Sequence, residues 1–210
     1  CLIGAAPDLG SAALLILILA AVAVAAGMPT RLLVVPGVVG LAALAAAIVV
    51  SPYRRERVVA FVNPEAAVEA SWQSYQSLVA IGSGGVLGRG YGSGLQKLFF
   101  LPEPHTDFIF SITGEEFGLF GLLVLMVLAA TITWRGMRVA LRQSNQHLAL
   151  VAFGLTFAYA AQSLVHMAVC LDLLPPKGIP LPLVSYGKTD LVVSLASLGL
   201  VLNLSREVGP

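Results

Sequence analysis

The sequence predicts an all-α, polytopic membrane protein that forms a single membrane domain over residues 1–210. Of these residues 58% are hydrophobic and 11% are charged, whereas soluble domains carry about 25% charged residues. Five apolar windows reach or approach the roughly 20 residues with which a helix crosses a bilayer core of about 30 Å. The formal net charge is +1 and the basic residues are scattered, which argues against a nucleic-acid partner.

Each apolar window predicts one transmembrane helix. The predicted spans are residues 10–28, 32–51, 117–134, 148–171 and 183–204. Pro36 in the second span is tolerated, because neighbouring helices satisfy the backbone groups that a proline frees. The fifth span is apolar apart from Lys188 and Asp190 near one end. The polar interval 52–116 is predicted to be one long loop between the second span and the third.

Basic residues in the short connections predict the orientation. If all five windows cross the bilayer, the arginines of these connections share one side, which is then cytoplasmic. They are Arg31, Arg135, Arg138, Arg142 and Arg206. The loop 52–116 is then extracytoplasmic, and its basic run Tyr53–Arg57 fits there because long loops translocate largely regardless of charge. The chain begins at Cys1 without a methionine or a signal peptide, so we expect an incomplete chain.

A glycine-dense run, IGSGGVLGRGYGSG, occupies Ile81–Gly94. It is not a dinucleotide-binding fingerprint, because Leu87 stands where GxGxxG requires its third glycine. Two interpretations remain open. The run is either a flexible, turn-rich linker at the membrane surface or a place where the backbone closely approaches a ligand or partner.

Asp107 lies in an unusual setting, FLPEPHTDFIF, where aromatic and aliphatic residues bracket a carboxylate. One interpretation is a general base at the lip of an apolar surface. The other is structural: Thr106 or Asp107 caps a helix that runs into Phe117. The spacing leaves both open. No catalytic triad and no zinc motif accompanies His105, but a magnesium ion held by one carboxylate and substrate phosphates remains possible.

Two further polar features lie near the fourth span. Gln162 and His166 are one helical turn apart within an apolar segment, which predicts hydrogen bonds between helices. The segment Asp172–Gly187, DLLPPKGIPLPLVSYG, holds four prolines and is predicted to be a rigid, non-helical outer loop. Cys1 and Cys170 are far apart without CxxC spacing, and we interpret neither as a disulfide or a metal ligand.

Four strings in this order resemble the C-terminal half of the SEDS family (FtsW, RodA and SpoVE). They are APDLGS, YRRERVVAFVNP, the stretch from YQSLVAIGSGG to GEEFGLFG, and PPKGIPLPLVSYG. The strings LQKLFFLPEPHTDFIF and GEEFG are more similar to the FtsW/SpoVE cell-division branch than to RodA. The resemblance implies a partial SEDS fold in the bacterial cytoplasmic membrane.

The resemblance also implies an activity, namely polymerisation of lipid II into glycan strands by a peptidoglycan glycosyltransferase. Its essential acidic residue matches Asp107, which would act as the catalytic base. Candidate substrate-binding residues in the matched strings are Lys97, His105, Thr106, Glu116 and Ser185. A divalent cation, Mg²⁺ or Mn²⁺, is a possible cofactor for the diphosphate leaving group. The implied partners are lipid II, a class B penicillin-binding protein and other division or elongation proteins. Two alternatives are a lipid II flippase and a non-catalytic scaffold of a division complex.

One string departs from the family pattern. Where the family reads SYGGSS, this chain reads SYGKTD, so that Lys188 replaces a small residue and Asp190 replaces a hydroxyl residue at the start of the last span. Charges near a helix end reach the interface, so we expect the span to insert. We expect close helix packing through small residues to be lost at this point.

Overall fold

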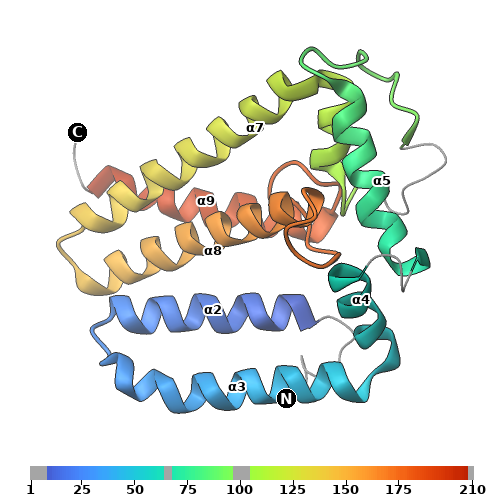
Figure 1. The fold of residues 1–210 in the computed structure, drawn as a ribbon. Coiled ribbons are helices and arrows are strands. Elements are labelled where there is room, and N and C mark those ends of the chain that lie inside the picture. Colours follow the sequence, from blue (N-terminus) through green and yellow to red (C-terminus); the bar gives the residue numbers. More distant parts are fainter. Residues whose placement is uncertain (1–8, 64–67, 97–104, 208–210) are drawn as a thin grey trace.

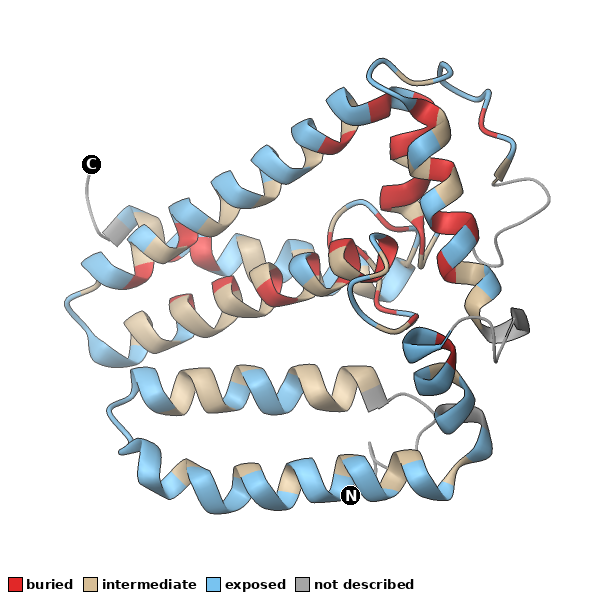
Figure 2. Ribbon diagram, in the orientation of Figure 1, coloured by how far each residue is buried: buried red, intermediate tan, exposed pale blue. Residues whose placement is uncertain are grey.

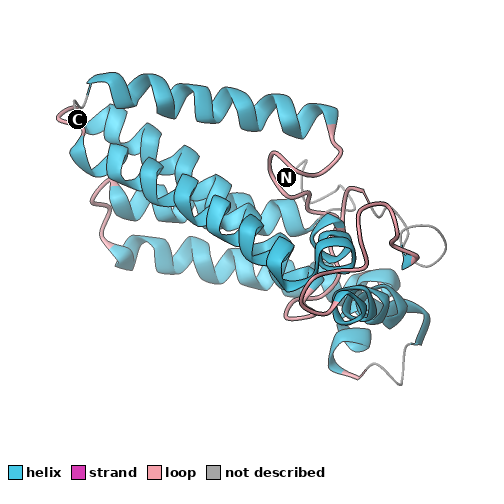
Figure 3. Ribbon diagram, turned by 90° about the horizontal axis from the view of Figure 1, so that it is seen from above, coloured by secondary structure: helices cyan, strands magenta, loops and turns pink. Residues whose placement is uncertain are grey.

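The computed structural model describes residues 9–63, 68–96 and 105–207. Within these ranges the regular elements are helices and there is no strand (Figure 3). The helices are α2 (Leu9–Ala25), α3 (Thr30–Val50), α4 (Pro52–Val62), α5 (Val68–Gly84), α7 (Ile109–Arg142), α8 (Gln146–Cys170) and α9 (Lys188–Glu207). The predicted all-α class is therefore confirmed.

Four helices are long and apolar enough to cross a membrane. They are α3, α7, α8 and, over Lys188–Arg206, α9. The shorter helix α2 is also apolar over Gly10–Ala25. The chain is thus a multi-pass membrane protein, and a fifth crossing by α2 stays a prediction.

The helices form two groups (Figure 1). Helices α7, α8 and α9 pack together, and α2 lies against α8, with α3 antiparallel beside α2. Figure 2 shows little burial on α3, where none of the residues is buried within the chain. Helices α4 and α5 gather at the end of the bundle where α7 begins and α8 ends. The segment 52–116, predicted as one loop, contains α4, α5 and the first residues of α7.

The main core lies at this same end of the bundle. Six buried residues from the start of α7, the end of α8 and the loop before α9 form it: Phe108, Phe110, Leu122, Met167, Cys170 and Leu181. A smaller cluster, Ala140, Ala152 and Leu204, closes the opposite end.

Helix α7 is interrupted at Gly118, whose backbone has φ 64° and ψ −160°. The break frees backbone groups that the segment after α5 satisfies. Leu119 N donates to Gly85 O (2.9 Å), and Arg89 N donates to Glu115 O (3.0 Å). The predicted span 117–134 corresponds to the part of α7 after this break. The part before it, from Ile109, is a separate short helical segment that the apolar window did not reveal.

The glycine run packs tightly against this break. A Cβ atom on Gly84 would lie 1.9 Å from Gly114 O, and one on Gly88 would lie 2.1 Å from Glu116 O. Such distances do not occur between real atoms, so these positions admit no side chain. The backbone does make a close approach here, but it approaches the chain's own helix α7, whereas the prediction named a ligand or partner. The flexible-linker interpretation is wrong for these residues, because their backbone groups are used to satisfy the helix break.

Asp190, one of the two residues that depart from the family pattern at the start of α9, takes part in a hydrogen bond between helices. Gln162 Nε2 donates to Asp190 Oδ1 and to Pro180 O, both at 3.0 Å. The expected hydrogen bond between helices is therefore present for Gln162, and α9 still packs against α8. His166 differs, because its Nδ1 pairs with Ile179 O (2.7 Å) in the loop rather than with a helix.

The predicted orientation is tested with two matched cysteine variants. Ser93 and Ser144 are both exposed and lie at opposite ends of the span that α7 forms. In intact cells we expect a membrane-impermeant maleimide to label Ser93→Cys. Ser144→Cys should react only after the membrane is permeabilised, because it follows the arginine-rich end of α7 in the connection that is predicted to be cytoplasmic. The opposite pattern would reject this orientation.

Candidate active site

The backbone that leads into α7 is held by residues far away in the sequence. Three consecutive carbonyl groups each accept a hydrogen bond there. Tyr186 N donates to His105 O (2.9 Å), and Ser185 Oγ donates to Thr106 O (2.7 Å). Cys170 Sγ lies 3.8 Å from Asp107 O as a weak donor. The end of α8 and the loop before α9 therefore fix where Asp107 lies.

Asp107 does not cap the helix that follows it. The cap residue of α7 is Phe108, which makes no side-chain cap hydrogen bond, and the helix begins at Ile109. Phe108 is 3% exposed and belongs to the main core, so burial of its ring accounts for the position of the helix start. The interpretation of Thr106 or Asp107 as the cap is thus wrong.

The Asp107 carboxylate lies directly against the loop before α9. A Cβ atom on Gly178 would be 2.9 Å from Asp107 Oδ2 and 3.5 Å from its Cγ. The side chain of Asp107 is half-buried, while Gly178 is exposed. An acidic group is thus presented at the surface of a proline-rich loop.

A cavity of about 570 Å³ shares this loop with Asp107. Its walls are mainly apolar and come from α2, α3, α8 and the loop, with Leu14, Leu17, Leu44, Ile48, Val165 and Val169 among them. Arg57, Lys177 and Gly178 also line it. Arg57 Nη1 donates to Pro176 O (3.0 Å), which ties α4 to the loop. Gly178 therefore lines the cavity and also lies next to the Asp107 carboxylate.

The predicted site residues fall into three groups. His105, Thr106, Asp107 and Ser185 come together at the start of α7, as described above. Glu116 is 5% exposed and faces the glycine run, since its Oε1 would be 3.3 Å from a Cβ on Gly94. Lys97 lies outside the described residues. Ser185 is also 5% exposed, and its hydroxyl bonds Thr106 O and Leu181 N, so its contacts in this structure are with the protein.

The sequence reasoning missed Arg57, Lys177 and Gly178 as parts of one site. The signal was present, because Lys177 and Gly178 lie in the loop between two proline pairs, and Arg57 lies in the basic run after α3. Nothing local indicated that these segments, separated by 119 residues at the Arg57–Pro176 contact, would meet.

The described residues contain no group of three or more His, Cys, Asp or Glu side chains arranged to hold a metal ion. A divalent cation at Asp107 would therefore need oxygen ligands from a bound phosphate group. Mg²⁺ is commonly held this way, by one or two carboxylates together with substrate phosphates. The described residues therefore fit a divalent cation only when a phosphate group is bound beside Asp107.

Comparison with known proteins agrees with this architecture. A family model described as cell cycle protein, FtsW/RodA/SpoVE, matches residues 1–209. "Probable peptidoglycan glycosyltransferase FtsW" of Geobacter sulfurreducens is 43% identical over 202 residues, which cover 96% of this chain and 54% of the relative. "Stage V sporulation protein E" of Bacillus subtilis is 37% identical over 201 residues, covering 95% and 55%.

A solved structure is also similar. It is described as "Structural coordination of polymerization and crosslinking by a peptidoglycan synthase complex", with a TM-score of 0.73 and 30% sequence identity. The match covers 97% of this chain and 57% of that chain. This chain thus spans about half the length of the relatives it matches, and the relatives' names agree with the expected FtsW/SpoVE branch. From the family model, the sequence identities and the shared fold, the chain belongs to the FtsW/RodA/SpoVE family of cell cycle proteins.

Proposed function

We propose that the protein containing this chain is a peptidoglycan glycosyltransferase that polymerises lipid II at the outer face of the bacterial cytoplasmic membrane. The observation that carries the proposal is the junction at Gly178. There Gly178 lies beside the Asp107 carboxylate and also lines an apolar cavity whose lining includes Arg57 and Lys177. The glycosyltransferase names of similar proteins support the same reaction class.

The reaction requires a base. A hydroxyl group of the acceptor sugar attacks the anomeric carbon of the donor sugar, and a new C–O bond forms. The bond from that carbon to the diphosphate oxygen breaks, and the diphosphate leaves with the electron pair. In the proposal Asp107 accepts the hydroxyl proton as the new bond forms, which is general base catalysis.

The basic residues suit the leaving group. Negative charge grows on the diphosphate in the transition state, and cationic groups placed there stabilise it. Arg57 and Lys177 line the cavity on the loop side, beside Gly178. A bound Mg²⁺ or Mn²⁺ would neutralise the same charge, and the diphosphate oxygens would supply its main ligands.

The apolar walls suit the lipid. A polyprenyl chain gains about 0.8 kcal/mol for each CH₂ group that it buries. In the proposal, the first isoprene units enter the cavity of about 570 Å³ between α2, α3 and α8, and the diphosphate stays near Arg57 and Lys177. We further propose a class B penicillin-binding protein as the transpeptidase partner, together with other division or elongation proteins.

Reconstitution of the full-length protein tests the function. In vesicles that contain lipid II, we expect glycan polymer on addition of the transpeptidase partner and none from the 210-residue chain alone, which spans about half of its relatives. A flippase would instead move lipid II between leaflets without forming polymer. A scaffold would do neither. Measuring polymer on gels and leaflet exchange with a fluorescent lipid II separates these three outcomes.

A further inference from the structure

Gly178 is in direct contact with the proposed catalytic base. The three atoms nearest to a Cβ built on Gly178 all belong to the Asp107 carboxylate group: Oδ2 at 2.9 Å, Cγ at 3.5 Å and Oδ1 at 3.6 Å. The first distance is shorter than real Cβ contacts allow. Any side chain at position 178 must therefore displace either the loop or the carboxylate.

Backbone conformation does not explain the glycine. Six other glycines of the described chain adopt a positive φ, among them Gly88 and Gly118, and Gly178 is not one of them. The broad β and right-handed α regions that alanine adopts lie at negative φ. The structure shows one reason for a glycine at this position: a side chain there would occupy the space of the Asp107 carboxylate.

The loop around Gly178 is held on both sides. Before it, Pro176 O accepts a hydrogen bond from Arg57 Nη1 (3.0 Å). After it, Ile179 O pairs with Nδ1 of the buried His166 (2.7 Å), and Pro180 O accepts from Gln162 Nε2 (3.0 Å). The prolines also fix φ at their own positions. The loop therefore has little freedom to move away from an added methyl group.

The backbone of Asp107 is equally constrained. Thr106 O is bonded to Ser185 Oγ at 2.7 Å, and the next residue, Phe108, is 3% exposed in the main core. The remaining response to a methyl group is rotation of the carboxylate about its own side-chain bonds. A displacement of about 1 Å at a reacting group costs on the order of 10²-fold in rate.

We propose that Gly178 is a positioning residue, whose missing side chain holds open the place of the Asp107 carboxylate. This inference rests on the proposed function of Asp107 as a base. Ser185 also helps to position Asp107, because its hydroxyl group donates a hydrogen bond to the carbonyl oxygen of the preceding residue, Thr106.

The test compares Gly178→Ala with Gly199→Ala in the full-length protein with its transpeptidase. Gly199 is the matched control, because a Cβ there meets nothing within 4 Å and its φ is not positive. We expect Gly178→Ala to lower kcat of polymerisation by about 10- to 100-fold, with KM changed less than about twofold, because binding groups stay in place. Gly199→Ala should keep the wild-type kcat.

A second readout does not depend on activity. In the Asp107→Cys variant, a small methanethiosulfonate reagent reports how open position 107 is. When Gly178→Ala is added to this variant, we expect the labelling rate of the cysteine at position 107 to fall several-fold. The added methyl group would pack against that side chain and shield it from the reagent. Wild-type kcat in Gly178→Ala, or unchanged labelling, would overturn the inference, and so would failure of Gly178→Ala to insert. If the wild-type protein makes no polymer, the proposed glycosyltransferase function is rejected. The labelling experiment would still test whether Gly178 keeps the position of residue 107 open.

Discussion

Asp107→Asn is expected to abolish glycan polymerisation while leaving folding, insertion and binding of the transpeptidase intact. An amide cannot accept the proton of the acceptor hydroxyl, and loss of a general base costs on the order of 10²–10⁴-fold in rate. Asparagine has nearly the same shape as aspartate, so the contact with Gly178 is preserved. Since Phe108 and not Asp107 is the cap of α7, no helix cap is lost either.

Asp172→Asn is the matched control for this experiment. Asp172 lies after the end of α8, in the loop that also holds Gly178. Its φ is 55°, a conformation that asparagine adopts as readily as aspartate. We expect it to retain the wild-type rate. Rates should be measured with lipid II, alongside thermal unfolding in detergent. Near-normal glycan synthesis by Asp107→Asn would remove Asp107 from the mechanism.

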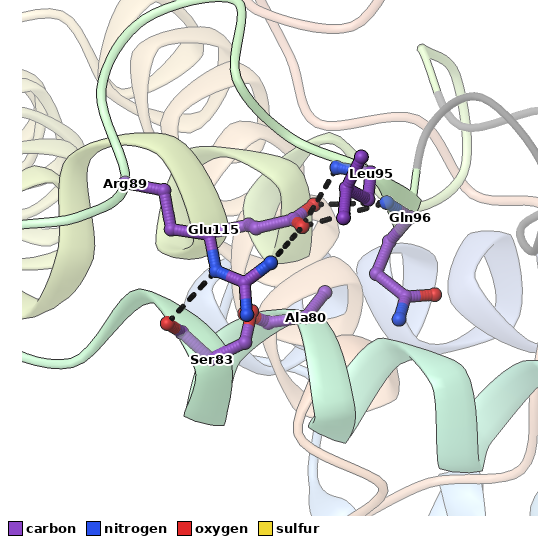
Figure 4. A network of polar contacts seen from close by, with 6 residues as sticks. All are labelled: Ala80, Ser83, Arg89, Leu95, Gln96 and Glu115. Carbon is purple, nitrogen blue, oxygen red and sulfur yellow. Dashed lines mark hydrogen bonds and ion pairs between the residues drawn. The ribbon is translucent and has the colours of Figure 1, made fainter.

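Glu115→Ala is expected to have the second large effect, on stability rather than chemistry. Glu115 is fully buried, and Oε1 accepts a hydrogen bond from Leu95 N at 2.9 Å (Figure 4). Gln96 N also donates to the carboxylate, at 3.3 Å to Oε2. Hydrogen bonds to a charged group contribute about 1.5–3 kcal/mol each. Because Leu95 and Gln96 are partly open to water, we expect a total loss of about 1.5–3 kcal/mol.

Arg89→Gln separates the hydrogen bonds of Glu115 from its ion pair. Arg89 Nη1 lies 3.8 Å from Glu115 Oε1, but the arginine side chain is 42% exposed. Ion pairs with an exposed partner contribute about 0–1 kcal/mol, so Arg89→Gln should lower the melting temperature much less than Glu115→Ala. Thermal unfolding and hydrogen exchange over residues 85–96 measure both. Equal losses in the two variants would mean that the contacts of Arg89, which are the ion pair and the hydrogen bond from Nε to Ser83 O (3.3 Å), hold the glycine run.

The glycine run illustrates where sequence patterns stop being informative. Glycine density is compatible with a flexible linker and with close packing, and the two cannot be separated from local composition. The break of α7 at Gly118 decides between them, because it frees backbone groups that only a neighbouring glycine-rich backbone can approach. The apolar window began near residue 117 although the helix begins at Ile109, because Glu115 and Glu116 interrupt the apolar sequence.

The sequence by itself determined the all-helical membrane fold and the family, and it singled out Asp107 as the candidate catalytic residue. Long apolar windows report a bilayer directly, because its thickness and lack of water restrict what can cross it. The tertiary structure decided what surrounds Asp107. Ser185 and Thr106 are 79 residues apart, and Arg57 and Pro176 are 119 apart. Such contacts depend on how α4, α7, α8 and the loop before α9 pack together, and no local periodicity encodes that packing. For the same reason the role of Gly178 becomes visible only when its loop lies against the carboxylate.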